Sequence, residues 1–188
     1  MDRRNWLRVL ASAPLAGLAG SWMAQPAFAK GEKAVEALQK NWKALLAEGA
    51  EVASSAEPLK LSDAQWKQRL SPAAYEVLRR EGTEPAGSSP LDREKRPGVF
   101  VCAGCRLPLF SSAMKFDSGT GWPSFFTTIP GAFGTSTDFK LIYPRTEYHC
   151  ARCGGHHGHV FDDGPEPTGL RYCNNGVALA FIPKSGKA

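Results

Sequence analysis

The chain has 188 residues, of which 43% are hydrophobic, and this is enough for one domain with a buried core. The formal net charge of +5 is spread along the chain, and basic residues do not gather on one aromatic-rich stretch. The composition therefore argues against a nucleic-acid-binding protein.

The N-terminal residues resemble an export signal. Arg3 and Arg4 open a motif of the twin-arginine type, an uncharged run extends from Val9 to Ala24, and Ala27-Phe28-Ala29 offers a small-x-small cleavage site. We expect residues 1–29 to be removed and the mature protein to be periplasmic, exported by the twin-arginine route. An uncleaved membrane anchor is the alternative, although the run is short for a bilayer span. No other segment is apolar enough to cross a bilayer, so we expect no stable membrane association after cleavage.

Residues 30–58 form a predicted helical extension and linker. From Lys30 to Ala47, apolar residues recur at helical spacing, and Gly49 ends the pattern. A short polar link runs from Ser54 to Pro58. We expect the helix to pack on the following domain or to tether it loosely through its apolar positions Val35, Leu38, Trp42 and Leu45.

Two further short helices are predicted before the texture of the sequence changes. Ser62 or Asp63 can cap a helix that carries Trp66. Pro72 suits the first turn of the next helix. Residues 82–96 are rich in Gly, Pro, Ser and charge, which predicts a long loop.

From Gly98 onward, short apolar runs are punctuated by Gly and Pro, which predicts strands. The fold class is therefore mainly β, built of short antiparallel strands preceded by two or three helices. The predicted strands lie at Val99–Val101, Leu141–Tyr143, Tyr148–Cys150, His159–Phe161 and Gly176–Ile182.

Four of the five cysteines form two matched C-x-x-C pairs. Cys102 with Cys105 and Cys150 with Cys153 are separated by 44 residues, a pattern typical of a closed structural zinc site. Four thiolates leave no open coordination position, so we expect no catalysis at the metal. Two short-range disulfides, or a thioredoxin-like redox pair, are the alternatives. The redox reading would require a strand-to-helix turn in a βαβ pattern, which is not seen here.

The fifth cysteine, Cys173, is flanked by polar residues. If Arg171 to Ile182 is one extended strand, Arg171, Cys173 and Asn175 share a face. The guanidinium would then lower the thiol pKa, and the amide could donate a hydrogen bond to the sulfur. We therefore predict a nucleophile, against the alternative of a buried, inert cysteine.

Three of the four histidines lie in the glycine-rich stretch between Gly154 and Pro165. A histidine near its pKa can protonate a developing oxyanion. The alternative is a set of surface histidines in a loop. Trp122 could line an apolar pocket, or it could belong to the core.

These residues resemble one family. The motifs F-D-S-G-T-G-W-P-S-F, C-A-R-C-G-G-H-H-G-H-V-F-D-D-G-P and R-Y-C-N-N, together with the paired C-x-x-C, are similar to methionine-R-sulfoxide reductases of the B type. The similarity runs from about Leu61 to Ile182, and we predict a catalytic domain over residues 59–185. The resemblance implies two small antiparallel sheets with helices at the start, and one structural zinc per chain.

The resemblance also implies the chemistry. The Cys173 thiolate attacks the sulfoxide sulfur, the oxygen leaves as water after protonation, and Cys173 becomes a sulfenic acid while methionine departs. In a straight strand two of the histidines would face opposite ways, so Gly158 between them is expected to supply a bend or bulge. The implied assistants are His156 and His159 at the sulfoxide oxygen, Asp163 and Arg171 in the same polar network, Asn175 beside the cysteine, and Trp122 around the substrate methyl.

Two departures from the family pattern stand out. His157 occupies a position that is usually apolar. Thr120 stands where many members carry a second cysteine that reduces the sulfenic acid. We therefore expect an external reductant, either a thioredoxin-like protein or a small thiol.

The expected role is repair of oxidised methionine, in exported proteins or as the free amino acid, by a monomer. Two other functions remain open. One is a zinc-ribbon binding module, and the other is a thiol redox sensor without turnover. A pure binding module has no need of the lone polar-flanked thiol of Cys173.

Overall fold

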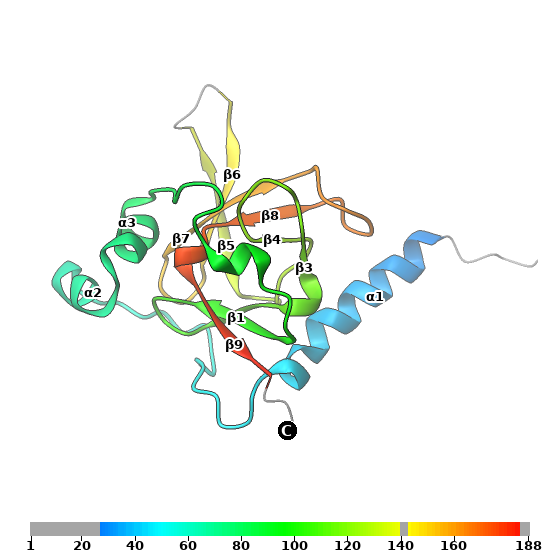
Figure 1. Cartoon of the computed structure of the whole chain (residues 1–188), viewed down its shortest axis with the longest axis horizontal. Coiled ribbons are helices and arrows are strands. Elements are labelled where there is room, and N and C mark those ends of the chain that lie inside the picture. Colours follow the sequence, from blue (N-terminus) through cyan, green and yellow to red (C-terminus); the bar gives the residue numbers. More distant parts are fainter. Residues whose placement is uncertain (1–26, 140–142, 185–188) are drawn as a thin grey trace, which may run out of the picture.

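The computed structural model describes residues 27–139 and 143–184 (Figure 1). The predicted export signal lies outside the described residues except for its last three positions, so its cleavage and the periplasmic location stay predictions. Within the described part of the chain, no helix is both long and apolar enough to cross a membrane.

The predicted extension begins with a helix that packs against the core of the domain. Helix α1 spans Ala27–Asn41 and continues as the 3₁₀ helix η1, Trp42–Leu45, close to the predicted bounds. Leu38, Trp42 and Leu45 pack against the core, so this helix is docked rather than loosely tethered. Figure 1 shows α1 running along one side of the sheets.

Helices α2 (Asp63–Arg69) and α3 (Pro72–Arg80) form where predicted. Ser62 is the cap of α2: its hydroxyl accepts from the backbone of Gln65, whose side chain accepts in return from the Ser62 backbone. The Ser71 hydroxyl caps α3, ahead of Pro72, by accepting from the backbone N–H of Ala74. The loop that follows contains one 3₁₀ turn, η2 (Pro90–Arg93).

A three-stranded antiparallel sheet has the order β2-β1-β9. Its central strand β1 is buried along its whole length, which explains why it is an unbroken apolar run. Phe110 of this sheet stacks on Phe125 of the other sheet, with ring centroids 3.9 Å apart, so the core lies between the two sheets. The strands are β1 (Gly98–Cys102), β2 (Pro108–Ser111) and β9 (Leu179–Pro183).

A six-stranded antiparallel sheet has the order β3-β4-β8-β7-β6-β5. The prediction of a mainly β fold with two antiparallel sheets is confirmed. Of the predicted strand Leu141–Tyr143, only Tyr143 is described, and it lies outside any strand. The strands are β3 (Lys115–Phe116), β4 (Ser124–Phe125), β5 (Phe133–Asp138), β6 (Arg145–Cys150), β7 (His156–Phe161) and β8 (Arg171–Asn174), and the 3₁₀ turn η3 (Ser112–Met114) precedes β3.

The prediction that Arg171 to Ile182 is one strand is wrong. Strand β8 ends at Asn174, the 3₁₀ turn η4 (Gly176–Ala178) follows, and β9 then enters the other sheet. The carboxylate of Glu84 accepts hydrogen bonds from the backbone N–H groups of Gly176 and Val177. These two N–H groups therefore do not donate to a neighbouring strand, and the chain turns from one sheet to the other.

Candidate active site and metal centre

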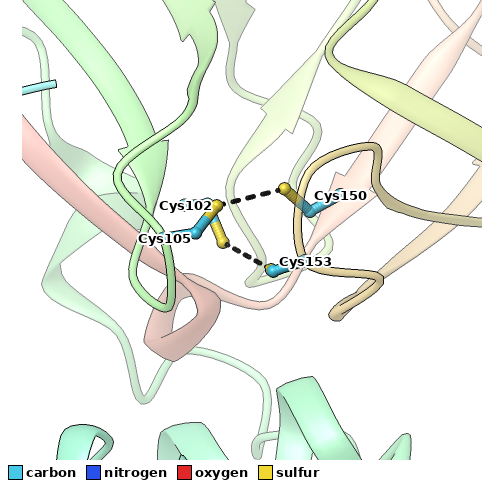
Figure 2. A group of neighbouring side chains, drawn as sticks. All are labelled: Cys102, Cys105, Cys150 and Cys153. Atoms are coloured by element: carbon cyan, nitrogen blue, oxygen red, sulfur yellow. Dashed lines mark hydrogen bonds between the residues drawn. The ribbon is translucent and has the colours of Figure 1, made fainter. Parts of the chain in front are cut away.

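The four paired cysteines converge on one point in the structure (Figure 2). Their sulfurs all lie within 4.8 Å of one another, and all four residues are buried. Across the two turns, Cys102 and Cys153 have sulfurs 3.7 Å apart, and Cys105 and Cys150 have sulfurs 3.5 Å apart. These separations are far beyond the roughly 2.05 Å of a disulfide bond. Among the described residues, this is the one cluster of His, Cys, Asp or Glu side chains that could hold a metal ion.

The donor set and its spacing fit a tetrahedral metal shell. Four sulfurs at a Zn–S distance of about 2.3 Å would be about 3.8 Å apart, which is close to the observed separations. Each pair sits on a tight turn, and left-handed backbone at Arg106 and Gly154 (φ +63° and +67°) lets the chain reverse after it. The four-cysteine site is therefore closed, with no position left for a substrate.

Cationic side chains and the N-terminal extension hold the turns of the four-cysteine site in place. Arg79 donates to the carbonyl of Cys153 and Arg152 to that of Cys105, at 2.9 and 2.8 Å. The backbone N–H of Ala53, in the extension, donates to the carbonyl of Arg106, and that of Leu59, directly after the extension, donates to the carbonyl of Arg152. The positive charges suit four thiolates around a divalent cation, which carry net negative charge.

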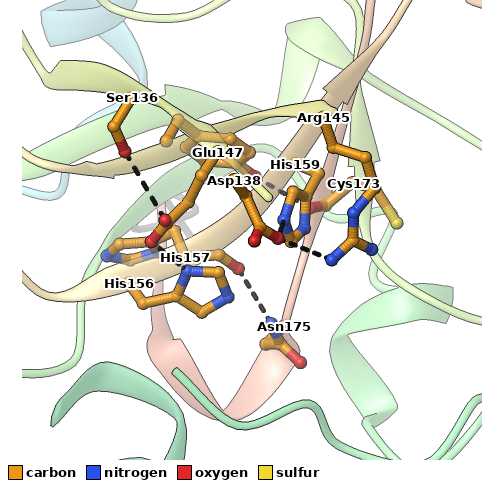
Figure 3. Close-up of polar contacts among 10 residues, drawn as sticks. Ser136, Asp138, Arg145, Glu147, His156, His157, His159, Cys173 and Asn175 are labelled. Carbon is orange, nitrogen blue, oxygen red and sulfur yellow. Dashed lines mark hydrogen bonds and ion pairs between the residues drawn. The ribbon is translucent and has the colours of Figure 1, made fainter. Parts of the chain in front are cut away.

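The fifth cysteine lies away from this site, on β8 of the larger sheet. Cys173 is half-buried, and the register places it opposite Ser124 on β4 and opposite His159 on β7 (Figure 3). Its neighbours enclose a small cavity of about 140 Å³. The cavity is lined by Thr83, Trp122, Arg145, Gly158, His159, Phe161, Cys173, Asn174 and Asn175.

Trp122 is held as one wall of this cavity. Its indole N–H donates to the carbonyl of Glu84 at 3.0 Å. Glu84 is itself buried, and its carboxylate binds the turn after β8. Glu84 thus fixes the tryptophan wall through its backbone carbonyl and the end of the strand that carries Cys173 through its carboxylate.

Arg171 lies beside Cys173, and its guanidinium forms an ion pair with Asp163. Two parallel hydrogen bonds of 2.7 and 2.8 Å join the guanidinium to the carboxylate, and the guanidinium carbon lies 4.3 Å from the centre of the Phe161 ring. The structure therefore brings the two predicted partners together near the thiol.

Arg171 lowers the pKa of the Cys173 thiol, as predicted, but the net shift of that pKa is upward. Burial raises the pKa of this thiol above its ordinary value, and this effect is larger than the opposing effects of Arg171 and the Thr120 hydroxyl. The sequence identifies the charged neighbour but not the burial of the sulfur. The thiol is thus mostly protonated at neutral pH, and the attacking thiolate forms only on loss of that proton.

Asn175 lies at the cavity, although not in the predicted way. Its side-chain oxygen accepts from the backbone of Glu84 at 2.9 Å, and its amide donates to the carbonyl of His157 at 3.0 Å. Both polar atoms of the Asn175 side chain are thus bonded to backbone groups rather than to the Cys173 sulfur. Because the strand ends before it, Asn175 ties the end of β8 to β7 and to the loop before β1.

The two candidate histidines are brought together by an irregularity in β7, as predicted. The pairing with β6 shifts between Gly158 and His156, so His157 is an extra residue in this strand. The rings of His156 and His159 lie 5.6 Å apart between centroids. A Cβ atom on residue 158 would lie 1.9 Å from the carbonyl oxygen of Cys173, so only glycine allows the strands to approach this closely.

The two rings nevertheless have different surroundings. His159 lines the cavity with Cys173, whereas His156 is almost fully buried and lies against Glu147, with 2.6 Å between its Nδ1 and the carboxylate. Burial lowers the pKa of His159, and the hydrogen bond to Asp138 partly offsets this effect. Its imidazole is therefore mostly neutral at pH 7.

The unusual His157 is a buried, neutral ring. It is fully buried, and burial lowers its pKa to about 3. Its Nδ1 lies 3.2 Å from the side-chain oxygen of Asn174, and its ring packs on Phe133. This histidine thus fills a core position as an apolar residue would, with one hydrogen bond added.

Sequence reasoning missed Thr83, Glu84, Asp138 and Arg145. Asp138 and Arg145 reach the site only because β5 and β6 pair in one register, with these two residues opposite each other. Thr120 was singled out only as a missing cysteine, and it lies within hydrogen-bonding reach of the Cys173 sulfur. No local sequence signal identifies the other four, because each depends on contacts between distant segments.

A half-buried thiol in a small cavity with an imidazole and an indole, apart from a closed four-thiolate centre, defines a thiol-based redox protein. Residues 70–183 match the family model described as SelR domain. The chain belongs to this family and is of the MsrB type.

Its relatives come from distant organisms. The chain is 50% identical over 123 residues to the peptide methionine sulfoxide reductase MsrB of Agrobacterium fabrum, covering 65% of this chain and 91% of that protein. It is 51% identical over 124 residues to the MsrB of Thiobacillus denitrificans, covering 65% and 94%. Against the chloroplastic peptide methionine sulfoxide reductase B1 of Arabidopsis thaliana, it is 51% identical over 120 residues, covering 63% and 59%.

Proposed function

We propose that the chain reduces methionine-R-sulfoxide, peptide-bound or free, to methionine. The observation that carries this proposal is the half-buried Cys173 on a cavity shared with Trp122 and His159. The relatives named peptide methionine sulfoxide reductase support the same reaction. A cavity of about 140 Å³ suits the methyl sulfoxide end of one side chain.

The reaction balances with this chain's residues and water. The Cys173 thiolate attacks the sulfoxide sulfur, and the oxygen takes up two protons and leaves as water. Water then attacks the Cys173 sulfur, releases methionine and one proton, and leaves a sulfenic acid. The sulfoxide sulfur gains two electrons, and the cysteine sulfur loses them. His159, on the strand opposite, is placed to supply a proton to the departing oxygen.

The epimers of the substrate test this function. The protein is expected to turn over the R epimer with dithiothreitol as reductant, and to leave the S epimer untouched, because the indole of Trp122 offers the methyl group one wall of an asymmetric cavity. Steady-state rates on separated epimers, free and in a peptide, measure this. Reduction of both epimers at similar rates contradicts the proposal. Oxidation of Cys173 without turnover would indicate a redox sensor instead.

We propose that an external thiol regenerates the enzyme. Thr120 occupies the position of the second cysteine found in many relatives, and the other four cysteines are buried in the four-cysteine site. A thiol from a thioredoxin-like protein or a small molecule would attack the sulfenic acid, release water and form a mixed disulfide, which a second thiol resolves.

One equivalent of methionine-R-sulfoxide without reductant is therefore expected to leave the protein heavier by one oxygen atom, on the peptide that contains Cys173. Mass spectrometry of the protein measures the added oxygen atom. Trapping with a sulfenic-acid reagent then shows that it is a sulfenic acid on this peptide. Cys173→Ser is the matched control and should give none. An intramolecular disulfide that includes Cys173 would show that one of the other cysteines resolves the intermediate.

We propose that the four-cysteine site holds one zinc ion through Cys102, Cys105, Cys150 and Cys153. Soft thiolates at these separations suit zinc, and a closed shell of this kind supplies folding energy rather than catalysis.

A further inference from the structure

Two carboxylate–histidine pairs lie side by side in the large sheet, and they use opposite nitrogens of the imidazole ring. Asp138 contacts Nε2 of His159 at 2.8 Å, whereas Glu147 contacts Nδ1 of His156 at 2.6 Å. An ionised carboxylate can only accept a hydrogen bond, so the ring nitrogen must donate. In its neutral form, each imidazole is thereby assigned a tautomer: Nε2–H in His159 and Nδ1–H in His156.

Only one of these pairs belongs to the cavity of the thiol. His159 lines that cavity and lies opposite Cys173 in the register of β7 and β8. With Nε2 held by Asp138, Nδ1 is the nitrogen left to exchange a proton with a bound molecule. His156 lines a different surface hollow, together with Glu147 and His149.

Arg145 completes the arrangement around His159 (Figure 3). Its Nη2 lies 2.6 Å from Oδ2 of Asp138, the same oxygen that accepts from His159. The carboxylate is nearly fully buried, with 5% of its side chain exposed, so the cation stabilises its negative charge in this position. Arg145 also lines the cavity beside Cys173.

We propose that Asp138 and Arg145 are positioning residues that set the tautomer and the proton affinity of His159. Asp138 holds the proton on Nε2 and stabilises the imidazolium, while Arg145 orients the carboxylate and limits how strongly it attracts the proton. The inference rests on the proposed function, because it assigns His159 as the proton donor to the sulfoxide oxygen.

The proton path is balanced. The imidazolium gives its Nδ1 proton to the sulfoxide oxygen and returns to the neutral Nε2–H form that Asp138 favours. The proton released when the sulfenic acid forms can recharge it. The carboxylate keeps its charge throughout, as in other carboxylate–histidine pairs.

The charges around His159 predict opposite effects for the two residues. Asp138 raises the pKa of His159, and Arg145 lowers it, in a site where burial lowers it most. The titratable and charged groups that face this ring are Asp138 on β5, Arg145 and Glu147 on β6, His156 on β7 and Cys173 on β8.

Nitrogen-15 NMR of the full chain, labelled at histidine, tests the proposal without any substrate. His159 is expected to show the Nε2–H tautomer and His156 the Nδ1–H tautomer. Asp138→Asn should lower the pKa of His159, and Arg145→Met should raise it. Arg145→Lys should stay near the wild-type value, because it keeps the charge. Thr135→Ala, at an exposed position of the same strand, is the control and should leave this titration unchanged.

The pH dependence of kcat/KM gives the second readout. Reduction needs a Cys173 thiolate, whose pKa is raised, together with a protonated His159, so kcat/KM should rise with pH up to the pKa of His159 and level off above it. This break should move to lower pH in Asp138→Asn and to higher pH in Arg145→Met, and Asp138→Asn should lose at least about tenfold at pH 7. A purely structural role would lower the rate in both variants without shifting the two profiles in opposite directions.

The two proposals fail differently. An Nδ1–H tautomer in His159, or a pKa that moves in the same direction in both variants, overturns the inference even if the wild-type protein reduces methionine sulfoxide. Absence of sulfoxide reduction by the wild-type protein overturns the proposed function, while the NMR result still decides the tautomer and the sign of each charge effect.

Discussion

Cys173→Ser is expected to lose at least about four orders of magnitude in the reduction of methionine-R-sulfoxide, since the nucleophile is removed. A serine hydroxyl is not ionised near neutral pH. Its oxygen also cannot give up two electrons to the sulfoxide, as the cysteine sulfur does when it becomes a sulfenic acid. The measurement is the steady-state rate with dithiothreitol and the R epimer, followed by separation of the products.

The same variant should fold normally. Cys173 is half-buried, and serine has nearly the same shape, so the free energy of unfolding should change by no more than about 1 kcal/mol. Zinc content should equal that of the wild type, because the sulfur lies outside the four-cysteine site. Wild-type turnover in Cys173→Ser would show that the nucleophile is a different residue.

Local signals explain why the helices could be predicted from the sequence. The cap at Ser62 and the proline at position 72 act within a single turn of the chain, and both helices begin where these residues place them. The four-cysteine site is predictable for a similar reason. Each C-x-x-C brings two sulfurs close together by local geometry alone, and the fold then needs only to join two pairs.

The end of β8 could not be predicted in this way. Residues 171–182 alternate as one strand would, yet the carboxylate of Glu84, more than 90 positions away from Gly176 in the chain, binds two backbone N–H groups and turns the strand. A hydrogen bond between such distant residues leaves no mark on the local pattern. The same contact explains the misplaced role of Asn175, which lies just beyond the strand rather than within it.

The electrostatics of the site depend equally on the three-dimensional arrangement. The sequence places Arg171 next to Cys173, but it does not show that the sulfur is buried enough for its pKa to rise. Nor does it show that Asp138 and Arg145, from the two strands β5 and β6, reach His159 on β7. Residue types and short-range spacing are thus predictable here, whereas burial and partners from neighbouring strands require the fold.

Cys102→Ser is expected to release zinc and to destabilise the whole domain. Cys102 ends β1, the central strand of the smaller sheet, and it is fully buried. Metal affinity at such a site is folding free energy, and structural zinc sites in peptides contribute roughly 10–16 kcal/mol. If about 5 kcal/mol of this is lost, the melting temperature should fall by roughly 10–20 °C for a chain of this size.

Thermal unfolding and metal analysis on the same sample measure this effect, with Cys173→Ser as the matched control for loss of a thiol. The control should keep one zinc per chain and its melting temperature but no activity, whereas Cys102→Ser should lose the metal first and its activity only through unfolding. Because the two turns of the four-cysteine site join β1 to β6, loss of the metal removes a tie between the two sheets, and the thiol cavity on the larger sheet should open with them. Stoichiometric zinc and an unchanged melting temperature in Cys102→Ser would mean that these sulfurs do not hold the metal.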